Sequence, residues 1–221
     1  YSKLPFDAIE DITAITIIGT TPLVLVVNPA KVPVQNVQEL VAFFKAKPDA
    51  YNYASSGNGT ILHLAAEMFV GEADVKVRHI PYKGVAPMVT DLIGGQVEMG
   101  MLALPSVQGH IKNGSLRAIG VGGAKRTAAA PDLPTIAEQG LPNYIVEAWF
   151  AVIGPAKLPL AQVTRIHSAL TTAFTTQEIR DAMAKQGNDV NLQTPDAANR
   201  FLRAESSKYA KLVKQSGVKV D

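Results

Sequence analysis

The segment from Ser55 to Thr60 holds the residue types best suited to bind a ligand. Its six residues are Ser55, Ser56, Gly57, Asn58, Gly59 and Thr60. The glycines allow positive φ, which turns backbone N–H groups inward. A helix beginning after Thr60 adds unpaired amides and a partial positive charge at its first turn. With the hydroxyls as further donors, the segment predicts a cradle for a small anion such as a carboxylate.

The same segment is also compatible with a plain connection between a strand and a helix. In that case Thr60 or Ser56 would only cap the helix. The segment is not a GxxxxGK[ST] phosphate loop, because no lysine follows Gly59. It is not a dinucleotide fingerprint either, because Leu62 stands where the third glycine would be. The pattern alone leaves the anion cradle and the plain turn open.

The serines suggest an enzyme as the alternative, a small α/β hydrolase or transferase with Ser55 or Ser56 as nucleophile. That chemistry requires a histidine within hydrogen-bond reach of the serine and a carboxylate behind the histidine. No GxSxG elbow occurs, and no histidines are spaced as HxH or HxxxH, as in metal sites. We therefore expect no enzyme, no cofactor and no metal site. The histidines are His63, His79, His110 and His167.

Composition excludes further classes of function. The 221 residues include 47% hydrophobic and 18% charged residues, which is typical of a globular protein with room for two lobes. The net charge of +2 is too balanced for a nucleic-acid footprint. Without cysteine, disulfides and thiolate metal sites are excluded. No apolar run is long enough to span a membrane, and residues 1–5 contain no signal-peptide core, so any such segment was removed or lies outside this sequence.

Hydrophobic periodicity predicts alternating strands and helices up to residue 121, in the order βαβαβαβαβ. That order favours an α/β fold with a mostly parallel sheet. Leu23 to Val27 is a continuous apolar run, typical of a strand buried on both faces in a parallel sheet. Prolines and Gly140 mark a crossover at 128–142. Expected strands are 23–27, 51–54, 75–80, 97–102, 116–121 and 148–153, and expected helices are 37–47, 62–69, 87–93, 107–112, 160–174, 177–186 and 195–216.

An ordered set of segments resembles the Bug-type receptors of tripartite tricarboxylate transporters. Single segments are weak signals, but they follow one another along nearly the whole chain. They are 3–7 (KLPFD), 24–29, 53–60 (YASSGNGT) with His63-Leu64, 79–84 (HIPYKG), 91–97 (DLIGGQV), 116–118, 131–135 (PDLPT) and 147–150 (EAWF).

The resemblance implies a two-lobed periplasmic-binding-protein fold of type II that closes on its ligand. One lobe would comprise residues 22–146, and the other 1–21 and 147–221. The implied function is periplasmic capture of a small carboxylate (an organic acid, an amino acid or an aromatic acid) for membrane transporter subunits. Besides the Ser55–Thr60 segment, the residues expected to face the ligand are Gly84, Val85, Ala86, Leu102 and Phe150.

Two departures from the family pattern shape further expectations. Family members carry a long stretch before the point at which this chain starts, so the first lobe is expected to be incomplete. Its open sheet edges would then favour a homo-oligomer, or the chain would be a truncated fragment that binds nothing. The second departure is the apolar segment 101–105, where relatives place a polar residue. From it we expect the ligand to present an apolar or aromatic portion to Leu102.

Overall fold

The computed structural model describes residues 4–217, and the chain divides into two compact units. The central unit is Pro22–Ala148. The terminal unit consists of residues 4–21 together with Trp149–Gln215. Residues 1–3 and 218–221, which were assigned to the first lobe, lie outside the described part of the chain.

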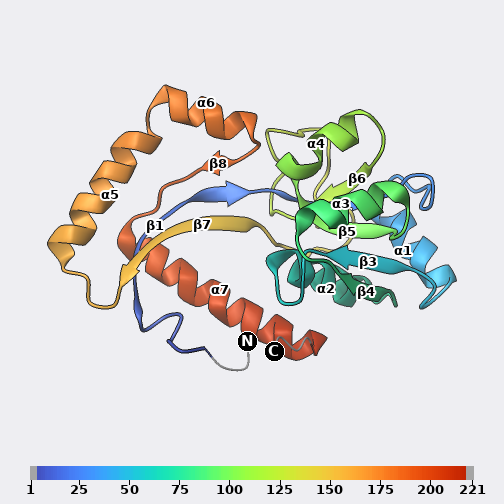
Figure 1. Cartoon of the computed structure of the whole chain (residues 1–221), viewed down its shortest axis with the longest axis horizontal. Coiled ribbons are helices and arrows are strands. Elements are labelled where there is room, and N and C mark those ends of the chain that lie inside the picture. The colour runs from blue at the N-terminus through green and yellow to red at the C-terminus, as the bar shows by residue number, and fades with distance from the viewer. Residues whose placement is uncertain (1–3, 218–221) are drawn as a thin grey trace. The chain divides into compact units, whose positions relative to one another are not determined.

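The central unit is built on a five-stranded sheet in the order β4-β3-β5-β2-β6 (Figure 1). β3 pairs in parallel with β4 and with β5, whereas β2 pairs antiparallel with β5 and with β6. One strand of the five, β2, therefore runs against the others. The strands are β2 (Leu23–Val27), β3 (Asn52–Ser55), β4 (Arg78–Pro81), β5 (Met99–Ala103) and β6 (Arg117–Val121).

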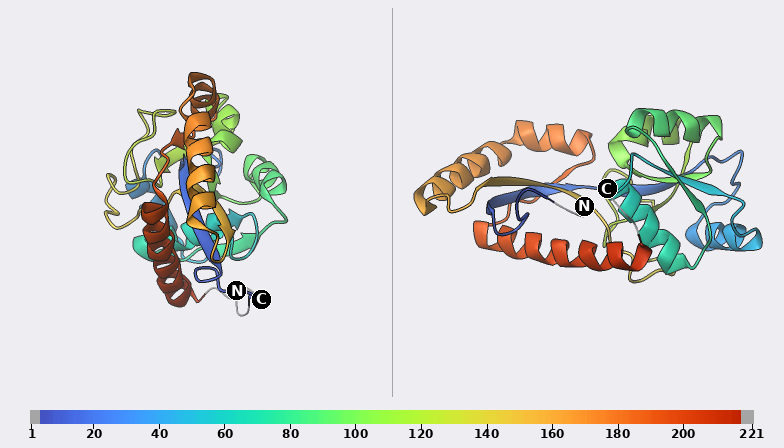
Figure 2. Two further views of the ribbon diagram at one scale, coloured as in Figure 1. Left: turned by 90° about the vertical axis from the view of Figure 1, so that its left-hand side faces the viewer. Right: turned by 60° about the horizontal axis from the view of Figure 1, so that its bottom comes forward.

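Four helices connect these strands and cover the sheet. They are α1 (Val37–Ala46), α2 (Ile61–Ala73), α3 (Val85–Gly94) and α4 (Leu104–Lys112). The chain passes from β3 through α2 to β4 at the sheet edge, and then through α3 back to β5 on the other side of β3. Because parallel crossovers are right-handed, these opposite directions place α2 and α3 on opposite faces of the sheet. Figures 1 and 2 show this arrangement.

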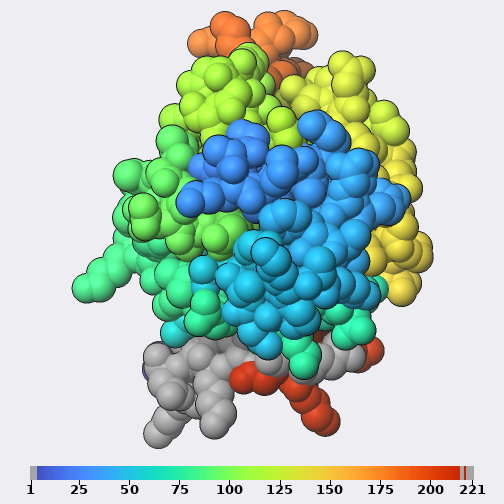
Figure 3. Space-filling model, turned by 90° about the vertical axis from the view of Figure 1, so that its right-hand side faces the viewer, coloured from blue at the N-terminus to red at the C-terminus, as the bar shows by residue number. Residues whose placement is uncertain are grey.

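The core of the central unit explains why β2 is a continuous apolar run. All five of its residues have no exposed surface, because helices cover both faces of the sheet. Tyr53 on β3, Phe44 on α1 and Phe69 on α2 belong to the same buried cluster. Figure 3 shows one face of this unit, on which helix α1 and the segment between β2 and α1, in blue, cover the middle.

The terminal unit contains a three-stranded sheet in the order β7-β1-β8 and three helices. Helix α7 packs on the sheet through Ala198 and Leu202, which form a small buried cluster with Ile17 of β1. Figure 1 shows α7 running along the strands. The elements are β1 (Ile12–Thr21), β7 (Ala148–Pro155), β8 (Asp189–Val190), α5 (Leu160–Phe174), α6 (Gln177–Lys185) and α7 (Pro195–Ser216).

The α/β class and the βαβαβαβαβ order are confirmed, and most predicted elements lie within a few residues of their observed bounds. Some details were wrong, and strands β1 and β8 were not predicted. β2 is antiparallel to its neighbours, because burial on both faces reports helical cover and not strand direction. The strand expected over 75–80 starts only at Arg78, where its pairing with β3 begins. Val75 is apolar because its side chain packs in the core, although it lies before the strand.

Candidate functional site

The Ser55–Thr60 segment leaves the carboxyl end of β3 and enters α2. Gly57 and Gly59 have φ values of 133° and 71°, which confirms the predicted positive φ at both glycines. Leu64 N–H donates to the carbonyl of Thr60 at 3.0 Å, which starts the helix. The loop therefore ends in an ordered helix N-terminus, in a place where open α/β sheets bind ligands.

The hydroxyls of the loop are occupied within the loop. Thr60 Oγ1 donates to the carbonyl of Gly57 at 2.9 Å and accepts the N–H of His63 at 3.3 Å, as an N-cap does. Ser56 Oγ donates to Thr60 Oγ1 at 3.2 Å. The expected capping by Thr60 is therefore present. The hydroxyl protons of Ser56 and Thr60 have acceptors within the loop, and their donation to a ligand stays a prediction.

Backbone amides are the donors that remain. Gly57 N–H donates to Ser55 Oγ at 3.2 Å, and Gly59 N–H donates to His63 Nδ1 at 3.0 Å. Within the described part of the chain, four amides of this loop and the first turn of α2 have no hydrogen-bond partner. Such amides at a helix start favour an anion. They belong to Ser56, Asn58, Ile61 and Leu62.

A second helix N-terminus lies beside the first. Gly84, with φ of 110°, is the N-cap of α3, and its N–H donates to the carbonyl of Ser56 at 3.2 Å. Tyr82 N–H donates to the carbonyl of Ser55 at 2.9 Å. These two bonds continue the pairing of β3 and β4 beyond the strands, and they join the two loops. The structure thus brings the sequence-predicted Gly84 next to the Ser55–Thr60 segment.

The first residues of α3 are those expected to face a ligand. Val85 is half-buried and Ala86 is exposed. In the described chain, neither N–H has a partner, as usual in a first helical turn. Two helix N-termini with unpaired amides therefore lie at the same edge of the sheet, and their partial positive charges add there.

An aromatic stack lies beneath the loop. The rings of His63 and His79 are 3.9 Å apart at an interplanar angle of 12°, and Tyr53 stacks on His79 at 4.8 Å. His63 Nε2 lies 3.7 Å from a carboxylate oxygen of Glu67, and the Tyr53 hydroxyl donates to the same carboxylate. Ser55 Oγ is hydrogen-bonded to His79 Nε2 at 2.6 Å. Sequence reasoning did not identify this cluster.

The electrostatics of the stack follow from its burial. Burial and the neighbouring His63 lower the pKa of His79 to about 4. Burial alone would raise the pKa of Glu67, but the hydrogen bonds with His63 and Tyr53 outweigh it and the pKa is lowered. Burial and Glu67 raise the pKa of Tyr53. At neutral pH the cluster is a neutral His79 and a neutral tyrosine beside an ionised Glu67.

The contact between Ser55 and His79 has the form that the enzyme alternative requires, but not its accessibility. Ser55 has no exposed surface, so its Oγ cannot reach a substrate. The same Oγ accepts the N–H of Gly57, which makes it part of the loop's internal bonding. The pair is therefore structural.

Two other predicted site residues lie elsewhere. Leu102 is a correction: its side chain has no exposed surface and belongs to the core of the central unit. The segment 101–105 is apolar because Met101, Leu102 and Leu104 are buried, which removes the reason to expect an apolar wall against the ligand. Phe150 lies on β7 of the terminal unit with 46% of its surface exposed, and its contact with a ligand stays a prediction.

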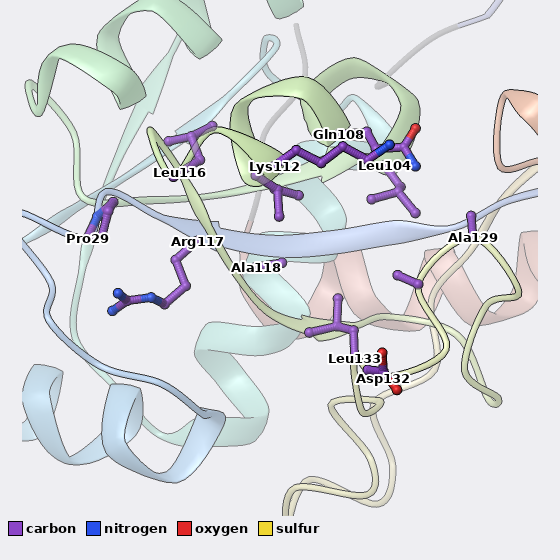
Figure 4. Close-up of a pocket in the computed structure, with 13 residues that line it drawn as sticks. Pro29, Leu104, Gln108, Lys112, Leu116, Arg117, Ala118, Ala129, Asp132 and Leu133 are labelled. Carbon is purple, nitrogen blue, oxygen red and sulfur yellow. The ribbon is translucent and has the colours of Figure 1, made fainter.

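A cavity of about 500 Å³ lies in another part of the central unit, between α4, β6 and the crossover (Figure 4). Its walls are mainly aliphatic, with Leu104, Leu116 and Leu133 among them, and Lys112, Arg117 and Asp132 add charge. It contains no predicted site residue. Within residues 4–217, no group of three histidine, aspartate or glutamate side chains is placed to hold a metal ion, and no helix is long and apolar enough to cross a membrane.

Comparisons with known proteins identify the family of this chain. The model of the "Tripartite tricarboxylate transporter family receptor" matches residues 1–218. Protein BugT of Bordetella pertussis (strain Tohama I) is 32% identical over 218 residues, which are 99% of this chain and 67% of that protein. A UPF0065 protein of Pseudomonas sp. (strain P51) is 30% identical over 96% of this chain and 63% of its own length. The chain spans about two thirds of the length of these relatives.

Solved structures agree with this placement. R. palustris Rpa4515 with adipate is 29% identical, with a TM-score of 0.88 over 99% of this chain and 73% of that one. A structure described as a periplasmic transporter is 31% identical, also with a TM-score of 0.88, over 99% and 73% of the two chains. These matches cover both units of the chain. It therefore belongs to the tripartite tricarboxylate transporter receptor family, a family of solute-binding receptors and not of enzymes.

Proposed function

We propose that this chain forms the ligand-binding part of an extracytoplasmic receptor that captures a small carboxylate and delivers it to the membrane subunits of a tripartite tricarboxylate transporter. We assign the two compact units to the two lobes of such a receptor. Family membership supports the receptor role and its periplasmic location. Rpa4515, with 29% identity, was solved with adipate, which supports a carboxylate as the ligand class.

The observation that carries the proposal is the pair of helix N-termini at the carboxyl ends of β3 and β4. The loops are joined by the hydrogen bond from Gly84 N–H to the carbonyl of Ser56, and the first turns of α2 and α3 present unpaired amides. One helix terminus contributes about 0.3–1 kcal/mol at an exposed site and up to about 2 kcal/mol when partly buried. Two adjacent termini, with no competing anion in the loops, favour a carboxylate over a neutral ligand.

The proposal is tested by isothermal titration calorimetry with adipate and, as a matched neutral control, its dimethyl ester. The ester has the same chain but carries no negative charge. We expect saturable binding of adipate and at least tenfold weaker binding of the ester. A panel of mono-, di- and tricarboxylates measured by thermal shift then defines the ligand class. Equal affinity for acid and ester, or no binding by any acid in the panel, would contradict the assignment.

The expected homo-oligomer remains part of the proposal. Large apolar side chains of the terminal unit, among them Phe150, Ile153 and Leu160, have 46%, 50% and 79% of their surfaces exposed. Exposed apolar surface of this kind favours association. Sedimentation velocity over a range of protein concentrations decides between a monomer and an assembly, and a concentration-independent monomer would remove the oligomer from the proposal.

A further inference from the structure

We propose that His63, held in its stack with His79, positions the Ser55–Thr60 loop for ligand binding. This inference rests on the proposed function, because it assigns a positioning residue to the same site. The carboxylate proposal rests on the unpaired backbone amides of the loop and of the first helical turns. The stack beneath them explains what holds those amides in place.

The first step is the bond from the loop to the ring. Gly59 N–H donates to His63 Nδ1 at 3.0 Å, so Nδ1 carries a lone pair and the ring proton sits on Nε2. Nε2 lies 3.7 Å from Glu67, whose carboxylate favours that tautomer. His63 is a residue of α2 itself. A side chain in the first turn of α2 therefore accepts a hydrogen bond from Gly59, which precedes the helix, and fixes the backbone of that glycine.

The second step is the fixing of the ring itself. His63 is only 4% exposed and stacks on His79 at 3.9 Å, and the ring of Tyr53 packs against both, at 4.8 Å from His79 and 6.3 Å from His63. His79 in turn is hydrogen-bonded to Ser55 Oγ at 2.6 Å, and Ser55 Oγ accepts the N–H of Gly57. The amides of Gly57 and Gly59 are thus tied to the same two imidazoles. The unpaired backbone N–H of Asn58 lies between these two glycines, so its peptide unit cannot rotate freely.

The test uses variants that separate the ring from its acceptor atom. His63→Phe keeps the aromatic stack and removes the acceptor. His63→Asn removes the ring but places an amide oxygen close to the position of Nδ1. His110→Asn is the matched control, because His110 lies on α4 and its side chain makes no hydrogen bond within the described chain. Gly59 amide exchange is measured by NMR on the full chain, and adipate affinity by calorimetry.

Loss of one hydrogen bond corresponds to about a tenfold effect. We expect roughly tenfold faster Gly59 amide exchange and roughly tenfold weaker adipate binding in His63→Phe, substantial recovery of both in His63→Asn, and no change in His110→Asn. Unchanged Gly59 exchange in folded His63→Phe would overturn the inference.

The two proposals fail in different ways. If the wild type does not bind adipate but Gly59 exchange follows the variants, the ligand assignment fails and the positioning role of His63 stands. If adipate binds with equal affinity in the wild type and in His63→Phe, the receptor stands and the positioning role fails. If His63→Phe does not fold, the NMR coupling across the hydrogen bond between Gly59 N and His63 Nδ1 in the wild type decides the question, and its absence would overturn the inference.

Discussion

The two units of this chain differ in how many apolar side chains they bury. The central unit has a continuous core that covers both faces of its sheet, and β2 is fully buried along its length. The terminal unit has a small cluster of Ile17, Ala198 and Leu202. Helix α5 buries Val163 alone, and α6 buries none of its residues.

This difference indicates where a preorganised site can be built. The binding loops of the central unit leave β3 and β4, and β3 is anchored by buried Tyr53, Ala54 and Ser55. Loops held by a rigid scaffold keep their amides aligned before the ligand arrives. Segments with little buried apolar surface open at low free energy, so α5 and α6 are expected to be the more dynamic part.

The largest expected effect comes from removing a leucine from the central core. Leu40 on α1 is fully buried, and Leu160 on α5 is 79% exposed. Leu40→Ala should lower the free energy of unfolding by about 2–5 kcal/mol, because it leaves a cavity in a close-packed core. Leu160→Ala, the matched control, should change it by less than about 0.5 kcal/mol. Urea denaturation measures both. Equal losses would show that the two units do not differ in packing.

The next largest effect is expected at Gly59, in the Ser55–Thr60 loop of the central unit. Gly59 has a φ of 71°, where a side chain with a branched Cβ costs about 1–2 kcal/mol. Gly59→Val should therefore distort the loop and weaken adipate binding by at least tenfold, while the buried strands keep the fold. Gly71→Val is the control, because Gly71 lies within α2 and a Cβ there meets no atom within 4 Å. Unchanged adipate affinity in Gly59→Val would show that the loop only connects two elements.

A smaller effect compares helix caps in the two units. Thr60 Oγ1 accepts the N–H of His63 at the start of α2, whereas Thr176 at the start of α6 makes no such capping bond. Thr60→Ala should cost about 1 kcal/mol of stability. Thr176→Ala should cost clearly less, since it removes only an exposed hydroxyl bonded to Ala173. Thermal unfolding of both variants checks this order, and a larger loss in Thr176→Ala would contradict it.

Part of this site was predictable from sequence, and the reason is local chemistry. Glycines between two serines and a helix start predicted positive φ and a capped helix, and both are present. The stack was not predictable, because His63 and His79 meet only through the parallel register that sets Tyr53 opposite His79. A histidine on the first turn of α2 with Glu67 four residues later was a local signal, but nothing local shows that His79 stacks on it.

The same reasoning explains the other misses. Strand β1 was overlooked because Ile12–Thr21 alternates weakly and pairs with strands far along the chain. The apolar run at β2 reported burial but not direction. Leu102 was read as a ligand wall because sequence shows that a residue is apolar, not which surface it faces. In each case the missing information was long-range pairing.

Acid should lower the stability of the central unit, because His79 and Glu67 both lie in it. The pKa of His79 is lowered to about 4 in the folded protein, from an ordinary value of about 6.5. Between these values the unfolded chain binds more protons than the folded one, so stability rises with pH in this window and is lost as pH falls from 6.5 towards 4. The lowered pKa of Glu67 acts in the same direction at lower pH.

His79→Gln can keep a contact with Ser55 but cannot titrate, so it should flatten the dependence of the unfolding free energy on pH between 6.5 and 4. Hydrogen exchange over the same range should show the loss in the amides of β3 and α2 before those of α7. An unaltered pH dependence in His79→Gln would show that His79 is not the source of the acid sensitivity.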